Sequence, residues 1–521
     1  MKFILALMAS LLCVPLSAQD ALPTVKVFVL AGQSNMQGQA VVDMDHPEHY
    51  NGGKGNLNDV MLKTKGRFAH LKSGDRWSER NDVKVRYKTE KQLKLGDLSI
   101  GFSGYEDGRH FGPELQFGHV VGDYLEEPVL LIKTAWGGKS LCKDFRPPSA
   151  VKARGGEVGP YYQQMMHEVE LALAEAATNF PEWSQHRFEI AGFVWQQGWN
   201  DMVDEKATNE YFKNLVDLID DVRSTWKRPN LPVVVGELGN DGPNAGVGMK
   251  RFRRQQARID AHGPFVSNVM FVPTAQHARP AEESPNTSHG HHWYGNAESY
   301  LLVGESLGLG MVELLERTGK PKILILGDSI SIGYTPHVKQ SMQGLGFVTR
   351  PMRTHRAAEN CAGTDNGILA IDRWLAMGDG HWDVIHFNFG LHDLKRVNAE
   401  SGKNSNNPDD PYQSDPQDYE KQLKAIVKKL KKTGAHLIFA TTTPVPPGVK
   451  PYRDPSDPVT YNEIARKIMM ENGIEINDLY AFTEPRLDQI QIPANVHFTA
   501  AGSKALGHEV TKVIQAALNQ P

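Results

Sequence analysis

The stretch TVKVFVLAGQSNM, at residues 24–36, decides how the chain is interpreted. Residues 25–31 predict a β-strand, and the motif AGQSNM comes directly after it. Ligands of parallel sheets collect at the carboxyl ends of the strands, so Ser34 stands where a nucleophile would be placed. Alone, the motif is more typical of a serine that caps a helix. The interpretation therefore depends on the residues at the carboxyl ends of the other strands.

Apolar runs that predict strands alternate with longer amphipathic segments throughout the chain, which is typical of βαβ units and a mainly parallel sheet. In the first half the predicted strands are residues 25–31, 128–134, 190–195, 233–237 and 269–272, and the predicted helices are 161–177, 211–226 and 296–317. The pattern restarts with strands at 322–326, 384–389 and 436–441 and helices at 418–432 and 499–518.

This repeat predicts two consecutive α/β/α domains, at residues 24–315 and 322–518, joined by a linker at 316–321. A chain of 521 residues is long enough for two or three domains. Residues 42–108 and 397–417 show no clear core periodicity, so we expect them to be surface insertions close to active sites.

The N-terminus predicts a secretory signal peptide at residues 1–19. Met1 and Lys2 form a short positive region, residues 3–16 are apolar, and Ser17-Ala18-Gln19 offers small residues for cleavage. The expected location is therefore the periplasm or the medium. Cys142 and Cys361 lie in different predicted domains, so we expect no disulfide framework.

The rest of the composition excludes several classes of partner. The net charge is −4 and no basic run suggests a nucleic-acid partner. No later apolar run is long enough to span a bilayer. The oligomeric state is left open.

Three further motifs stand after later strands of the first half. They are AWGG at 135–138, QGWND at 197–201 and HGHHWY at 289–294. Glycines let backbone N–H groups approach a ligand closely, amide side chains donate hydrogen bonds, and an imidazole accepts a proton. A nucleophile, a base and donors on one rim of a sheet are what acyl transfer requires.

The combination of GQSNM, WGG, QGWND and HHWY resembles the SGNH-hydrolase superfamily, whose domains have a flavodoxin-like fold. Within it, residues 24–315 are similar to sialate O-acetylesterases and acetyl-xylan esterases. The resemblance implies that Ser34 is the nucleophile and His292, rather than His289 or His291, the base. It also implies an oxyanion hole formed by the Ser34 N–H, a glycine N–H near Gly137 or Gly138, and an amide of Asn200 or Gln197.

The first domain departs from that family pattern at one position. The family usually has aspartate three residues before its histidine, where this chain has His289. We therefore expect another acceptor to orient the imidazole, and Glu282 and Glu283 are the nearest upstream acids. A metal site in this histidine cluster is the less favoured alternative, because its spacing matches no established motif.

The second half resembles the SGNH (GDSL-type) esterase domain. The motif GDS places Ser329 after the strand at 322–326, and NVHF places His497 before the last helix. The resemblance implies that Ser329 is a nucleophile, His497 its base and Gly363 a donor in the oxyanion hole. His392 occupies the position of the usual oxyanion asparagine, and Ala494 that of the usual aspartate. We therefore keep two interpretations, an active esterase and a degenerate domain retained for packing or binding.

Four aromatic residues lie next to these motifs: Trp136, Trp199, Trp293 and Tyr294. They fit a platform for sugar rings, and they equally fit a wall of the core beneath the loops.

The sequence thus predicts a secreted esterase that removes acetyl groups from carbohydrates and needs no cofactor or metal. The alternatives are a lipid or aryl esterase of the same superfamily, and a carbohydrate-binding protein with eroded sites.

Overall fold

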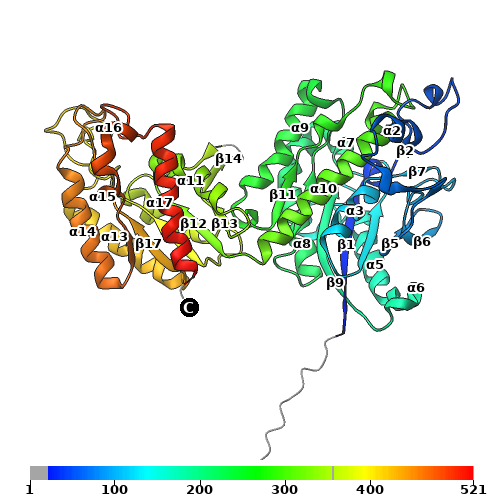
Figure 1. Cartoon of the computed structure of the whole chain (residues 1–521), viewed down its shortest axis with the longest axis horizontal. Helices are drawn as coiled ribbons and strands as arrows, with labels where there is room; N and C mark the ends of the chain where they lie inside the picture. The colour runs from blue at the N-terminus through cyan, green and yellow to red at the C-terminus, as the bar shows by residue number, and fades with distance from the viewer. Residues whose placement is uncertain (1–21, 355–356, 520–521) are drawn as a thin grey trace, which may run out of the picture.

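The computed structural model describes residues 22–354 and 357–519, so the predicted signal peptide lies outside the described residues. Two α/β units lie side by side, the first blue to green and the second yellow to red (Figure 1). No helix in the described ranges is long and apolar enough to cross a membrane.

The first unit is built on a seven-stranded sheet with the order β11-β10-β9-β1-β8-β5-β6, in which only the β5–β6 pair is antiparallel. Its strands are β1 (Thr24–Gly32), β5 (Arg80–Lys88), β6 (Leu93–Leu98), β8 (Val129–Ala135), β9 (Arg187–Gln196), β10 (Val233–Gly236) and β11 (Val269–Val272). The five predicted strands are confirmed.

Helices cover both faces of this sheet, because β1 is apolar on both sides. Val27 and Val29 pack with α5 (Pro160–Ala174), α8 (Glu205–Thr225) and α9 (Val247–Ala257). Phe28 and Leu30 pack with α3 (Glu114–Tyr124) and α10 (Ala297–Thr318) on the other face. This arrangement gives the three predicted layers.

The prediction that residues 42–108 form only a surface insertion is wrong. This segment supplies β5 and β6 to the central sheet. Val83 and Val85 of β5 are fully buried, and the charged residues that alternate with them are buried as well. Lys84 pairs with Asp97 and Glu182, and Arg86 pairs with Glu168. The ion pairs allow both faces of this strand to be buried.

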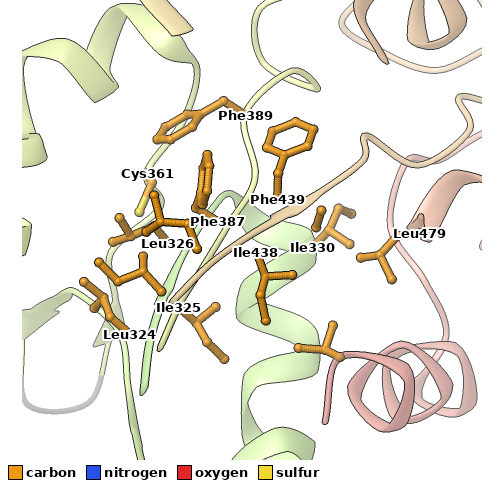
Figure 2. Packing of buried hydrophobic residues seen from close by; sticks show 14 of the residues in the cluster. Leu324, Ile325, Leu326, Ile330, Cys361, Phe387, Phe389, Ile438, Phe439 and Leu479 are labelled. Carbon is orange, nitrogen blue, oxygen red and sulfur yellow. The ribbon is translucent and has the colours of Figure 1, made fainter. Parts of the chain in front are cut away.

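The second unit has a five-stranded, all-parallel sheet with the order β13-β12-β16-β17-β18. Its strands are β12 (Lys322–Leu326), β13 (Phe347–Thr349), β16 (Val384–Phe387), β17 (His436–Ala440) and β18 (Glu475–Asn477). Helix α11 (Ser329–Ser341) packs on α17 (Ala500–Leu518). Helix α13 (Pro416–Leu430) packs between α12 (Thr364–Leu375) and α14 (Asp457–Asn472). Figure 2 shows Leu326, Phe387 and Phe439 packed around the strands.

The connection between the units is shorter than predicted. Helix α10 continues to Thr318, so only residues 319–321 separate it from β12. The units also touch, because the Gly378 N–H donates to the Gly263 carbonyl at 2.7 Å. Cys142 and Cys361 are both free thiols.

Candidate active sites

Ser34 begins the short helix α1 (Ser34–Gln37) at the carboxyl end of β1. Gly32 makes this turn possible, because a Cβ at that position would collide with the Gln196 carbonyl oxygen. The Ser34 N–H lies in the first turn of a helix, where backbone N–H groups have no intrahelical acceptor. It is therefore free to bind an oxyanion, as the resemblance implies.

Gln33 holds the neighbouring amide loop in place. Its Oε1 accepts from the Gly198 N–H and from Gln197 Nε2, both at 3.2 Å, and its Nε2 donates to Asn200 Oδ1 at 3.2 Å. This contact fixes the orientation of the Asn200 amide. Asn200 Nδ2 donates to the Gly138 carbonyl at 3.0 Å and keeps a second hydrogen.

The two predicted amide donors differ in availability. Gln197 is buried, and its Nε2 lies within bonding distance of Gln33, the Lys139 carbonyl and Asp201. Its two hydrogens are therefore used inside the protein. Asn200 is partly exposed, and Gly137 lies beside Ser34, since a Cβ on Gly137 would be 4.0 Å from Ser34 Cβ. Gly138 is exposed and its N–H has no partner among the described residues. Asn200, Gly137 and Gly138 therefore remain the predicted donors that are able to face a ligand.

The predicted base, His292, lies in the histidine loop, residues 289–292. This loop is hydrogen-bonded to Asn35, the residue after Ser34. Asn35 Nδ2 donates to the His291 carbonyl at 3.1 Å. The hydroxyl of Tyr300, at the start of α10, is 2.8 Å from Asn35 Oδ1 and 3.2 Å from the His292 carbonyl. Sequence reasoning missed Asn35 and Tyr300 as residues that position the loop.

No hydrogen bond joins Ser34 Oγ to His292, although both residues belong to the described part of the chain. Glu282 and Glu283 are exposed, and neither carboxylate bonds a histidine of the loop, so the expectation that one of them orients the imidazole finds no support. Burial, together with the charges of His291 and His289, lowers the pKa of His292 to about 4. The ring is thus neutral, as a general base must be.

A hollow of about 310 Å³, which we call the histidine pocket, opens beside this loop. It is lined by His289, His291 and His292 of this loop and, among others, by Gln39, Tyr105 and His110. In residues 22–354 and 357–519, no group of three His, Cys, Asp or Glu side chains is arranged to hold a metal ion.

The four aromatic residues do not form one platform. Trp136 is fully buried against Phe145, and Trp293 is 2% exposed, so both belong to the core rather than to a sugar-binding surface. Trp199 and Tyr294 are partly exposed. The Trp199 ring lies 5.6 Å from that of His291, so Trp199 packs beside the histidine loop.

The second centre brings its predicted pair together. Ser329 begins α11 after β12, and His497 Nε2 lies 2.9 Å from Ser329 Oγ. The other ring nitrogen, Nδ1, lies 2.7 Å from Asn495 Oδ1. Asn495 Oδ1 also accepts from the His497 N–H at 3.0 Å. The three side chains therefore form a Ser–His–Asn chain.

Asn495 fills the role for which the sequence offered no aspartate. It lies two residues before His497 rather than three, and Ala494 before it has a φ of +50°. An amide oxygen can only accept, so it fixes Nδ1 as the protonated nitrogen and leaves the lone pair of Nε2 toward Ser329. The same tautomer is set by the aspartate of a Ser-His-Asp triad.

The predicted oxyanion donors of this centre have no competing partner. Gly363 precedes α12, and neither its N–H nor the His392 ring forms a hydrogen bond with another described residue. Burial, reinforced by the charges of Lys395, Arg453 and His497, lowers the pKa of His392 to about 3. Its imidazole is therefore neutral across the physiological range and carries one N–H.

Each centre rests on a buried aspartate that sequence reasoning did not single out. Asp201 accepts from the Leu141 and Cys142 N–H groups at 2.7 and 2.9 Å, and it fixes the loop after Gly138. Asp393 accepts from the Thr364 N–H at 2.7 Å beside Gly363. A Cβ on Gly363 would lie 2.9 Å from Asp393 Oδ1, which explains the glycine there. Asp201 is the last residue of QGWND, and Asp393 directly follows His392.

The family described as "carbohydrate esterase, sialic acid-specific acetylesterase" matches residues 24–303, more than half of the chain. The chain belongs to this family. A second family, GDSL-like lipase/acylhydrolase, matches residues 325–505 of the same esterase. Both matches make the protein a carboxylic ester hydrolase. Ser34 lies within the first match and Ser329 within the second.

The chain is also similar to one curated protein and to several solved structures. A probable carbohydrate esterase of Arabidopsis thaliana is 25% identical over 232 residues, covering 43% of this chain and 73% of the relative. The solved structure of an Arabidopsis thaliana protein covers 56% of this chain and 98% of its own, with 18% identity and a TM-score of 0.35. An acetyl xylan esterase structure covers 37% and 99%, with 16% identity and a TM-score of 0.29.

Proposed function

We propose that this esterase removes acetyl groups from carbohydrates by forming an acyl-enzyme on serine, and that the Ser34 and Ser329 centres both do so. The observation that carries the mechanism is the Ser329–His497–Asn495 chain, with contacts of 2.9 and 2.7 Å. It is the geometry of a nucleophile, a base and a residue that orients the base.

At the Ser329 centre the reaction proceeds in two steps, acylation of the serine and hydrolysis of the acyl-enzyme. Ser329 Oγ attacks the acetyl carbonyl while His497 Nε2 takes the serine proton. The resulting oxyanion accepts hydrogen bonds from the Ser329 and Gly363 N–H groups and from His392. Collapse expels the sugar oxygen, which takes the proton from His497. Water then repeats the sequence on the acetyl-serine and releases acetate.

The same roles at the Ser34 centre fall to His292 as base and to Gly137 or Gly138 and Asn200 as donors. Here the serine and the base are not bonded to each other. Hydrogen bonds of catalytic groups often tighten only when substrate binds. Polar side chains line the histidine pocket next to this centre, which favours a sugar over a lipid or aryl ester. Export by the signal at residues 1–19 would bring the enzyme to extracellular glycans.

Acetate release from acetylated sialic acids, acetylated xylan and sulfated algal glycans tests the proposal. We expect release from at least one of them, and we expect the Ser34→Ala/Ser329→Ala variant to release none. Equal release by that variant would refute a serine mechanism at these two centres. Hydrolysis of long-chain acyl esters alone would refute the carbohydrate substrate. Detection of the mature chain outside the cytoplasm, beginning near residue 20, would test export.

A further inference from the structure

The histidine pocket adjoins the Ser34 centre but is built largely by other segments. Its volume of about 310 Å³ is near the lower end for small-ligand sites, which run from about 300 to 1,000 Å³. The lining outside the histidine loop includes Tyr105, from the connection between β6 and β7, and His110 of β7 (His110–Phe111). The pocket is therefore large enough for one small ring.

Tyr105 is an exposed aromatic side chain whose orientation is fixed by contacts to Gln39 and His110. It is 42% exposed, yet its hydroxyl donates to Gln39 Oε1 at 2.6 Å. Its ring stacks on that of His110, with centroids 3.9 Å apart and planes 22° from parallel. His110 thus covers one face of the Tyr105 ring, while 42% of the residue stays exposed and leaves ring surface for a ligand. A preorganised ring of this kind loses little entropy when a ligand stacks on it.

The polar groups around Tyr105 suit a neutral ligand with many hydroxyls. Gln39 and Asn286 bring amides to the pocket, and no lysine or arginine lines it among the described residues. Asp107 is the one carboxylate in this lining; it accepts from the Arg109 N–H and lies 3.2 Å from His110 Nδ1. Burial lowers the pKa of His110, so that ring is neutral as well. The pocket offers donors and acceptors with little net charge.

We propose that the histidine pocket binds one neutral pyranose ring of the substrate, stacked on the exposed ring surface of Tyr105. The inference rests on the proposed function of the Ser34 centre, because His292 lines the same pocket. It assigns sugar recognition to the segment between β6 and β7, whereas Trp136 and Trp293 belong to the core.

Calorimetric titration of xylobiose into the Ser34→Ala variant tests binding apart from catalysis. Adding Tyr105→Ala should raise Kd about three- to tenfold, the usual strength of an aromatic stack. Tyr124→Ala is the matched control, because Tyr124 is also 42% exposed but lies at the end of α3. It should leave Kd unchanged. Undetectable binding to Ser34→Ala, or equal Kd values with and without Tyr105, would overturn the proposal.

Kinetics in the Ser329→Ala background separate this proposal from the function on which it rests. Tyr105→Ala should raise KM for acetylated xylo-oligosaccharides more than KM for 4-nitrophenyl acetate, whereas Tyr124→Ala should change neither. An equal effect on both esters would contradict a sugar site at Tyr105. If Ser329→Ala hydrolyses neither ester, the proposed function of the Ser34 centre fails, while the titration still decides whether the pocket binds sugar.

Discussion

Asn495 offers the sharpest perturbation, because it touches His497 and no other catalytic group. We consider Asn495→Ala in the Ser34→Ala background, where only the Ser329 centre remains. The variant loses the 2.7 Å contact to Nδ1 and the 3.0 Å contact from the His497 N–H. A neutral hydrogen bond contributes about 0.5–1.5 kcal/mol, so the ring contact alone is worth roughly a 2- to 13-fold change.

The tautomer adds to this effect. Without an acceptor at Nδ1, the imidazole also populates the form protonated at Nε2, which cannot take the serine proton. A wrong tautomer in a Ser-His-Asp triad costs about 10⁴ in kcat, which sets an upper limit. Asn495 is a neutral amide and stabilises the imidazolium less than the aspartate of a triad does. We therefore expect Asn495→Ala to lower kcat by about 10- to 100-fold.

Asn495→Asp is the matched control. A carboxylate accepts the same two bonds and also stabilises the imidazolium, so kcat should be retained or raised. The assay is kcat for 4-nitrophenyl acetate together with the melting temperature of each variant. An orienting role for Asn495 is refuted if Asn495→Ala is as active as its parent. It is equally refuted if a folded Asn495→Asp loses as much activity as the alanine variant.

Three further predictions concern the remaining groups. In the Ser34→Ala background, His392→Ala should lower kcat about 10²–10³-fold, as loss of an oxyanion donor does. His392→Asn should keep activity, because its amide also donates. Similar kcat values for both variants would argue against His392 as an oxyanion donor. In the Ser329→Ala background, kcat/KM should rise with pH through about 4, the pKa of His292, because the imidazole must be neutral to act as base. It should stay flat at higher pH. A pH profile with its midpoint near 6.5 would contradict a pKa lowered by burial. Tyr300→Phe should remove about 1–3 kcal/mol of stability, because buried Asn35 Oδ1 loses its partner, and should lower kcat at the Ser34 centre. Tyr419→Phe, which removes a buried hydroxyl bonded to the Phe389 carbonyl, should lower only the melting temperature.

The sheet cores were predictable from sequence because most central strands are unbroken apolar runs. Residues 269–272 and 322–326 match β11 and β12 at both ends. Strand β5 was missed because charged Lys84 and Arg86 alternate with its apolar residues, whereas apolar runs make up most of each predicted central strand. Ion pairs with carboxylates of other segments allow these two charges to be buried. Propensity and periodicity contain no information about such partners.

Site residues were predictable from sequence where a short motif marks a single candidate residue. Ser329 and His497 are 168 positions apart, yet each lies beside a recognisable element, and the structure places them in contact. Asn495 was missed because the family pattern looks three residues before the histidine, and the local backbone brings the residue at two before it into reach. The Asn35–Tyr300 contact spans 265 positions, and Tyr300 belongs to no motif.

Covalent labelling of the nucleophiles tests the central claim most directly. The wild-type chain is treated with an acetyl-ester-like phosphonate and the modified peptides are located by mass spectrometry. We predict phosphonylation at Ser329 and Ser34, loss of esterase activity in proportion to labelling, and no label on the Ser34→Ala/Ser329→Ala variant. A label on a different residue that abolishes activity, or full activity with both serines blocked, would contradict catalysis by these two serines.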